Sequence, residues 1–307
     1  MFETIANFLI ASVFLSASAT GWFDCGLPAN TVALPNQQPS IKMPQRVVAG
    51  PTAGVKVTAE SYIVVEPESG AVLYEKNATE PRAIASITKL MTVVTFLEYN
   101  PGWDKEITMA SDDFRAGAVP VFSVGDKITV KDLFYATLVA SSNEGANALA
   151  RSTGLKTEDF VFQMNVRAKL LDMKDSKFVE PTGLSDDNHA SAEDIVKLIR
   201  VAFSHSEIQK AGSTKNYTIK VLNKNAARKV ESTDKILKED FGAKEASYKI
   251  EAGKTGFTNA AGYCFASQVK DDKDRQLLIT VLGSSSTYDR FTDTKALAYW
   301  VFNNYEW

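Results

Sequence analysis

Strand-type patterns lie near both ends of the body of this chain, with helical patterns between them, and this order most constrains the fold. Apolar runs at 62–65 and 71–74 flank a Pro-Glu-Ser-Gly turn, which predicts a β-hairpin. Near the other end, strand-like runs at 264–269 and 277–282 are joined by the charged turn 271–274. We therefore predict one α/β sandwich, with an antiparallel sheet built from both ends of the chain and a helical middle.

The helices are predicted from apolar residues that recur at helical spacing. Such residues run from Ser86 to Tyr99 and stop before Pro101, so a largely buried helix is expected there. Further helices are expected at 131–150 in two pieces interrupted near 141–143, at 157–171, at 191–203 and at 288–302. No internal repeat and no second domain is expected.

Composition excludes several classes of protein. The chain has 307 residues, is 45% hydrophobic and 23% charged and contains 2 Cys, which excludes disorder, collagen and a disulfide scaffold. A net charge of -3 is too small to attract a polyanion, so nucleic acid is not an expected partner.

The N-terminus has the pattern of an exported protein. Residues 5–15 are mostly apolar and precede Ala17-Ser18-Ala19, so residues 1–19 resemble a signal peptide, although no Lys or Arg occurs before Lys42. The alternative is an uncleaved anchor, which would be the only membrane contact. Residues 20–58 are rich in proline and are predicted to be a linker, which leaves a folded domain at 59–307. We expect the protein in the periplasm or extracytoplasmic envelope.

The two cysteines are interpreted separately. Cys25 is taken as a lone thiol, and Cys264 lies among apolar neighbours, where a cysteine usually packs as a small hydrophobic residue. A disulfide between them is the alternative outside the cytoplasm.

The first motif that carries chemistry is Ser86-Ile87-Thr88-Lys89. A spacing of three residues at a helix start places the hydroxyl and the amine on one face. A serine needs an adjacent base to become a nucleophile, and a lysine amine serves if its surroundings keep it neutral. Taken alone, the motif also fits a serine N-cap followed by a solvated lysine.

Two more motifs follow along the chain. Ser141-Ser142-Asn143 interrupts a helical segment and can direct a hydroxyl and a carboxamide into a cleft. Lys254-Thr255-Gly256 begins a strand region, where a cation and a hydroxyl can hold a ligand carboxylate. A phosphate-binding loop at 248–255 is excluded, because that motif requires a glycine at position 248, where this chain has Tyr248.

Together and in this order, the three motifs resemble the signature of penicillin-recognising serine acyltransferases. From Ser61 to Trp307 the chain is similar to the D-alanyl-D-alanine carboxypeptidase family of low-molecular-mass penicillin-binding proteins, which are serine D,D-peptidases, including the endopeptidase branch. Three longer sequence segments resemble the family more specifically than the short motifs do: ASITKLMT at 85–92, FVEPTGL at 178–184 and KTGFTNAAG at 254–262. The resemblance implies a β-lactamase/D,D-peptidase-like α/β sandwich and a catalytic domain at 59–307.

The resemblance also implies a catalytic role for four residues. Ser86 would attack the carbonyl of the penultimate D-alanine, and Lys89 would act as its base. Ser141 would relay a proton to the leaving amine, and Asn143 would orient Lys89 and the substrate amide.

A second set of residues would bind the substrate. Lys254, Thr255 and Gly256 would receive the terminal carboxylate of the peptide, and the N–H groups of Ser86 and Phe257 would form the oxyanion hole. The implied partners are peptidoglycan peptides ending in D-Ala-D-Ala, with β-lactams as inhibitors, and neither a metal nor a cofactor is required.

Other interpretations remain open from the sequence. Asp186, Asp187 and His189 are candidate metal ligands, although a polar loop is favoured. Arg290 is a candidate to attract a carboxylate or to pair with Asp289 or Asp293.

The reaction class also has alternatives. A His-dependent hydrolase is excluded, because the chain has 2 His and no G-x-S-x-G. Class A β-lactamases carry a deacylating Glu between the second and third motifs, followed four residues later by Asn. Here Glu180 is followed four residues later by Leu184, which disfavours this class. A non-catalytic peptidoglycan-binding scaffold is the other alternative. We expect a carboxypeptidase, with endopeptidase activity left open because both branches share the motifs.

Overall fold

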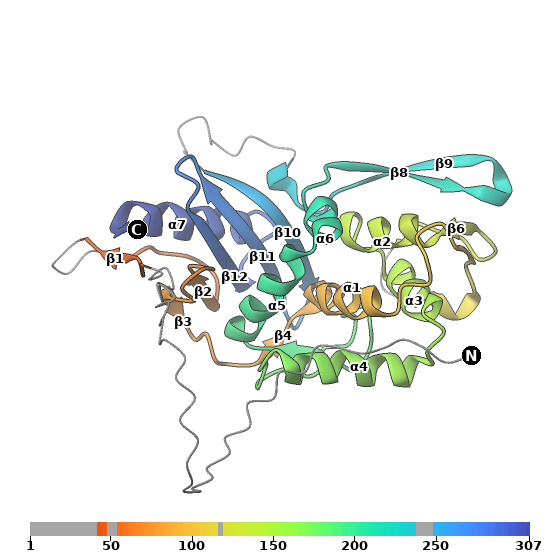
Figure 1. The fold of residues 1–307 in the computed structure, drawn as a ribbon, viewed down its shortest axis with the longest axis horizontal. Coiled ribbons are helices and arrows are strands. Elements are labelled where there is room, and N and C mark those ends of the chain that lie inside the picture. The colour runs from red at the N-terminus through yellow and green to blue at the C-terminus, as the bar shows by residue number, and fades with distance from the viewer. Residues whose placement is uncertain (1–41, 48–53, 116–118, 238–247) are drawn as a thin grey trace, which may run out of the picture. The chain divides into compact units, whose positions relative to one another are not determined.

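The protein's structure is a computed structural model that describes residues 42–47, 54–115, 119–237 and 248–307. Its centre is a five-stranded antiparallel sheet (Figure 1). In spatial order the strands are β10 (Tyr248–Thr258), β11 (Gly262–Asp271), β12 (Gln276–Ser284), β2 (Ser61–Val65) and β3 (Val72–Lys76). Strand β12 pairs with β2, so the two ends of the domain meet in one sheet, as predicted.

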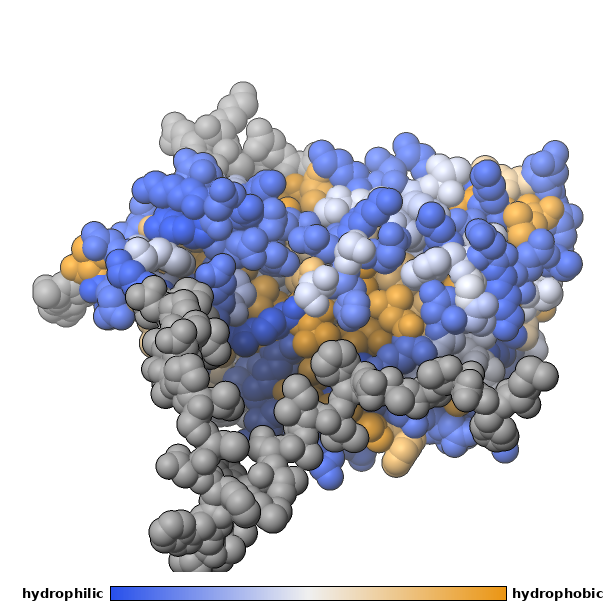
Figure 2. All heavy atoms as spheres, viewed as in Figure 1, coloured by the Kyte–Doolittle hydropathy of each residue, from blue (hydrophilic) through white to orange (hydrophobic). Residues whose placement is uncertain are grey.

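Helices cover both faces of this sheet (Figure 1). Side chains alternate along β2, so Ile63 and Val65 join a large core with the helical middle, while Tyr62 and Val64 join a second core under α7 (Asp289–Asn304). The remaining helices are α1 (Thr88–Glu98), α2 (Val130–Val139), α3 (Asn143–Ser152), α4 (Thr157–Leu170), α5 (Ala192–Ser204) and α6 (Ser206–Gly212). Hydrophilic residues cover most of the face in Figure 2, and apolar residues gather over the region of α1.

The predicted elements are found with small differences in their bounds. Ser191 caps α5 by accepting a hydrogen bond from Asp194 N, as its pattern predicts. The helix expected from Ser86 begins at Thr88, because residues Ala85–Ile87 form a 3₁₀ turn. The interruption expected near 141–143 separates α2 from α3.

One hairpin in the middle was not predicted. Strands β8 (Asn216–Val221) and β9 (Ala226–Glu231) pair with each other, and a turn with Asn225 at φ 44° joins them. Tyr217, Ile219 and Val221 alternate with exposed residues and pack on the helical core. The alternation was therefore present in the sequence, and the helical middle also contains this hairpin.

Three two-stranded ribbons complete the fold. They are β1 (Gln45–Arg46) with β13 (Tyr305–Glu306), β4 (Arg82–Ala83) with β7 (His189–Ala190) and β5 (Glu106–Thr108) with β6 (Lys127–Thr129). Within the described ranges, none of the helices has the length and apolar composition needed to span a bilayer.

Part of the segment predicted as a linker, residues 20–58, contacts the domain. Strand β1 pairs with the C-terminal β13, and Thr58 donates hydrogen bonds to Asp293 from its N–H and its hydroxyl. These groups find partners on the domain, so residues 45, 46 and 58 of this segment are held against it. The predicted signal peptide at 1–19 and Cys25 lie outside the described residues.

Asp293 is predicted to be important for stability. Its carboxylate is 3% exposed and accepts hydrogen bonds from Thr58, Ala59 N and Ser284 Oγ. Asp293→Ala should lower the free energy of unfolding by about 3 kcal/mol, because several buried donors lose their acceptor. Urea denaturation measures this change. Asn303→Ala, at an exposed position of the same helix, is the control, and equal midpoints for wild type and Asp293→Ala would contradict the prediction.

Candidate active site

Ser86 lies in the 3₁₀ turn just before α1, and Lys89 lies in the first turn of that helix. The spacing of three residues brings Lys89 Nζ to 2.8 Å from Ser86 Oγ. Ala85, immediately before the serine, has φ 47°, a backbone conformation that a residue other than glycine rarely adopts. The turn therefore holds the hydroxyl at a sharp corner next to the amine.

The Lys89 side chain is fully buried and faces neutral oxygen atoms. Besides Ser86, its Nζ contacts Asn143 Oδ1 at 2.6 Å and Thr182 O at 2.5 Å. Burial lowers the pKa of Lys89 to about 7, although Glu180 and Glu144 oppose the shift. A substantial fraction of the amine is therefore neutral near pH 7.

A neutral amine fits this set of contacts. It has two N–H groups, which Asn143 Oδ1 and Thr182 O can accept, and one lone pair, which faces the Ser86 hydroxyl. In this state the Ser86 O–H donates to Lys89 Nζ. The arrangement therefore provides a base that is oriented toward the serine, rather than the solvated lysine of the alternative interpretation.

The junction between α2 and α3 supplies Ser141, which lies in the turn, and Asn143, which is the first residue of α3. Ser141 has φ 57°, which reverses the backbone after α2, and Ser142 caps α3 by accepting a hydrogen bond from Gly145 N. This break directs Ser141 toward Lys254 and Asn143 toward Lys89. The interruption in the helical pattern was the sequence signal for this geometry.

Lys254 lies on β10 and is 1% exposed. Its Nζ donates to Ser141 Oγ at 2.9 Å and to Thr255 O at 2.8 Å. Burial lowers the pKa of Lys254, and repulsion from Lys89 and Arg290 lowers it further. The site thus holds two buried lysines whose positive charges disfavour each other.

Two glycines let backbone segments pack against the turn that carries Ser86. A Cβ on Gly256 would lie 2.8 Å from Ile84 O, and one on Gly183, which has φ +81°, would lie 2.0 Å from Ala85 O. No side chain fits at either place. Strand β10 and the turn at 182–184 therefore approach Ser86 from two sides.

Phe257 and Arg290 lie at the end of β10. Phe257 is 48% exposed and its ring stacks on Tyr263 with the centroids 4.3 Å apart. Arg290 is buried, and its Nη1 donates to Gly256 O at 3.1 Å. Asp293 is occupied by other donors, so the pairing of Arg290 with Asp293 considered from the sequence is not formed in this part of the structure.

The structure thus brings together the predicted residues of all three motifs. The roles of the Ser86 and Phe257 N–H groups in an oxyanion hole stay a prediction. Sequence reasoning missed Thr182, whose carbonyl oxygen accepts from Lys89, and Thr233, whose Oγ1 lies 2.6 Å from Thr255 Oγ1. Thr182 lies in the FVEPTGL segment at 178–184, but the sequence did not indicate which residue of that segment contacts Lys89. Thr233 had no local signal, because its role depends on contacts with distant segments.

Of the candidate metal ligands, Asp186 and Asp187 lie in a polar loop, and His189 begins strand β7. Asp186 and Asp187 are exposed, and Asp186 Oδ1 accepts a hydrogen bond from Thr258 Oγ1 at 2.9 Å. Among the described residues no cluster of His, Cys, Asp and Glu is suited to a metal ion. Cys264 is a free, buried thiol, consistent with its interpretation as a small hydrophobic residue.

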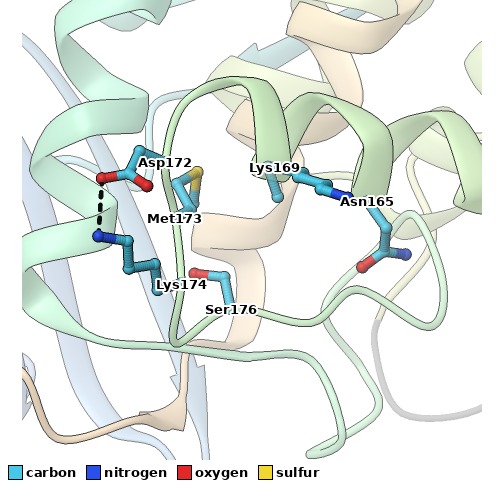
Figure 3. A pocket seen from close by; sticks show the side chains of 7 residues that line it. Asn165, Lys169, Asp172, Met173, Lys174 and Ser176 are labelled. Carbon is cyan, nitrogen blue, oxygen red and sulfur yellow. Dashed lines mark ion pairs between the residues drawn. The ribbon is translucent and has the colours of Figure 1, made fainter.

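A separate pocket of about 420 Å³ lies at the end of α4 (Figure 3). It is lined by Asn165, Ala168, Lys169, Asp172, Met173, Lys174 and Ser176. None of the three motifs contributes to it. Its polar groups already serve the local fold, since Ser176 Oγ donates to Asp194 and Asn165 bonds the backbone of Phe178, so it is not the candidate active site.

Comparison with known proteins identifies the family. Residues 46–286 match the D-alanyl-D-alanine carboxypeptidase family of peptidases, S11. The chain therefore belongs to this family, as its motifs predicted.

Individual relatives agree with this assignment. D-alanyl-D-alanine carboxypeptidase DacF of Bacillus subtilis is 30% identical over 260 residues, which cover 81% of this chain but 63% of that protein. The D-alanyl-D-alanine endopeptidase of Pseudomonas aeruginosa is 29% identical over 257 residues, which cover 82% of this chain and 81% of that one.

A solved structure confirms the predicted fold class. Penicillin-binding protein D2 of Listeria monocytogenes, in its cefotaxime-bound form, superimposes with a TM-score of 0.70 at 30% identity. The match covers 82% of this chain and 100% of that chain. The α/β sandwich is therefore that of the penicillin-binding D,D-peptidases.

The two lysines predict a specific pH effect. Their repulsion is mutual, so Lys254→Gln should make Lys89 a stronger base and raise the apparent pKa of the acid limb of the rate profile. The same variant should weaken binding of carboxylate-bearing ligands. Acylation rates with a fluorescent penicillin from pH 5 to pH 9 measure both effects, and a profile identical to that of wild type would indicate that Lys254 lies outside the reacting site.

Proposed function

We propose that this chain is a serine D,D-peptidase that removes the terminal D-alanine from peptidoglycan stem peptides ending in D-Ala-D-Ala. The observation that carries the proposal is the contact of the buried Lys89 amine with the Ser86 hydroxyl, in a chain that belongs to the D-alanyl-D-alanine carboxypeptidase family. The place of action is the extracytoplasmic cell envelope, where this substrate lies.

Acylation follows from the contacts of Lys89. The neutral amine takes the Ser86 proton as Oγ attacks the carbonyl carbon of the penultimate D-alanine. The N–H groups of Ser86 and Phe257 stabilise the oxyanion. As the C–N bond breaks, the proton that Lys89 took from Ser86 passes through the Ser141 hydroxyl to the leaving amine, which returns Lys89 to its neutral state. The hydrogen bond between Ser141 and Lys254 orients this hydroxyl. The product is an ester of Ser86.

Hydrolysis returns the site to its starting state. Once the free D-alanine has left, water attacks the ester carbonyl and Lys89 accepts a proton from that water. Breaking of the ester bond restores the Ser86 hydroxyl, to which Lys89 returns the proton. Asn143 holds Lys89 in place throughout, because its Oδ1 accepts a hydrogen bond from Nζ.

Lys254 and Thr255 bind the carboxylate of the departing D-alanine. Lys254 is buried and adjoins the reacting groups through Ser141, so a ligand carboxylate next to it gains a strong charge-assisted hydrogen bond. The Thr255 hydroxyl lies on the same strand and supplies a second contact. This requirement favours peptides that end in a free carboxylate.

Cleavage of cross-links is the second candidate activity. Endopeptidases and carboxypeptidases of the family are both among the relatives, and the similarity covers 81% of the Pseudomonas aeruginosa endopeptidase against 63% of DacF. Mass spectrometry of muropeptides after incubation with sacculi distinguishes the two, because trimming shortens stem peptides while endopeptidase action separates cross-linked dimers.

Glu180 does not fit the role of a β-lactamase base. Its Oε2 accepts from Thr182 N and Oγ1, and its Oε1 accepts from Gly183 N and Asn188 Nδ2. These hydrogen bonds occupy both oxygens of the carboxylate and tie Glu180 to its own loop rather than leaving it free to orient a water molecule. The loop role supports a D,D-peptidase over a class A β-lactamase.

Ser86→Ala is expected to abolish covalent labelling by a fluorescent penicillin and to abolish trimming of stem peptides. The reason is that no other hydroxyl contacts Lys89 Nζ among the described hydrogen bonds. Gel fluorescence and muropeptide analysis measure the two losses, with Ser204→Ala, at an exposed serine, as the control. A Ser86→Ala protein that is still labelled would refute the assignment, and a wild type that binds sacculi without cleaving them would support a scaffold.

Penicillin is expected to form a long-lived adduct. The β-lactam ring opens on Ser86, but the leaving group stays tethered and blocks the path that a free D-alanine would have vacated. Intact-protein mass spectrometry should show one stable adduct that persists long after excess drug is removed. Rapid turnover of a chromogenic cephalosporin would instead support the β-lactamase alternative.

A further inference from the structure

The segment after β9 connects two of the three motifs. Thr233 N–H donates to Val139 O at 3.1 Å, two residues before Ser141. Its hydroxyl lies 2.6 Å from Thr255 Oγ1 on β10. The next residue, Asp234, is therefore held between the helical part of the site and the strand that carries Lys254.

Asp234 is a buried carboxyl group with one oxygen that lacks a hydrogen-bond partner. The residue is 2% exposed, and Oδ1 accepts from Ile236 N at 2.9 Å. Oδ2 accepts no hydrogen bond from any residue in the described ranges. A Cβ on Gly253 would lie 2.9 Å from this oxygen, so the carboxyl group packs against the backbone just before Lys254.

Several charges meet around Lys254. Lys89 on α1 and Arg290 on α7 repel it, and Asp234 is the carboxylate whose charge attracts it. The groups that Lys254 Nζ contacts directly, Ser141 Oγ and Thr255 O, are neutral. Among the described residues, Asp234 is the carboxylate that offsets the positive charges of Lys254 and Arg290.

The charge on Asp234 depends on the same cations. Burial raises the pKa of Asp234 to about 6, while Arg290 and Lys254 oppose the shift. Its carboxyl group is therefore mostly ionised above about pH 6, in the range where Lys89 becomes neutral. The negative charge is present when the base is active.

We propose that Asp234 is a positioning residue that stabilises the positive charge of Lys254 from beside strand β10 and thereby maintains the carboxylate-binding state of the site. It acts through Lys254 and does not touch the substrate. The inference rests on the proposed function, because it assumes that Lys254 receives the carboxylate of the substrate.

The test compares a ligand that has a carboxylate with one that lacks it. Acylation rates are measured with benzylpenicillin and with its methyl ester for wild type and Asp234→Asn, which keeps the size of the side chain and an acceptor for Ile236 N. For Asp234→Asn at pH 8, the ratio of the acylation rate with benzylpenicillin to the rate with its methyl ester should be about tenfold lower than for wild type. The alkaline limb of the pH–rate profile with benzylpenicillin should also move to lower pH. An unchanged preference and limb would overturn the proposal.

A matched control separates this effect from general damage. Asp132 is also a buried carboxylate, which accepts from Tyr217 Oη and Lys220 N, and it does not shift the pKa of Lys254. Asp132→Asn should leave the preference for the acid unchanged. An equal fall in both variants would overturn the specific role of Asp234, because structural damage would then explain it.

A measurement on the wild type covers the case in which Asp234→Asn does not fold. NMR of protein labelled with ¹³C at the aspartate side chains follows the titration of the Asp234 carboxyl group. The proposal requires this group to be ionised at pH 8, and a carboxyl that stays protonated there would overturn it. Wild type that is not acylated by penicillin would contradict the proposed function, while the NMR titration would still decide the charge of Asp234.

Discussion

Burial of the Lys89 amine is the constraint on which the rest of the site depends. A fully buried ammonium that faces only neutral oxygens is costly, so the pKa of Lys89 falls to about 7. The neutral amine then matches its surroundings, with two N–H groups for Asn143 and Thr182 and a lone pair for Ser86. The same burial that lowers the pKa thus also fixes the direction of proton transfer.

Close packing between backbone segments holds these active-site groups in position. Gly256 and Gly183 bring β10 and the 182–184 turn against the corner that carries Ser86, at distances that exclude a side chain. Arg290 supports this corner by donating to Gly256 O. The second lysine, Lys254, therefore lies near enough to Lys89 that the two charges are coupled, and the charge state of one site affects the other.

Sequence patterns predicted the sheet, most helices and the three motifs, because each has a local periodicity or a fixed spacing. They missed β1, which pairs with the C-terminal β13, since two residues carry no pattern and their partner lies at the other end of the chain. They also missed Thr233 and Asp234. A Ser-Thr-Asp stretch predicts only a polar turn, and its importance comes from tertiary contacts with Val139 and Gly253.

Titration of Lys89 itself shows whether this amine can act as the base for Ser86. NMR of protein labelled with ¹³C at the lysine ε carbons, with Lys89→Gln to assign the signal, reports the pKa of this amine in the free enzyme. We predict a midpoint near 7, far below the ordinary value of 10.5. A Lys89 signal that titrates above pH 10 would contradict it, because the lysine would then be a permanent cation and could not take the proton from Ser86.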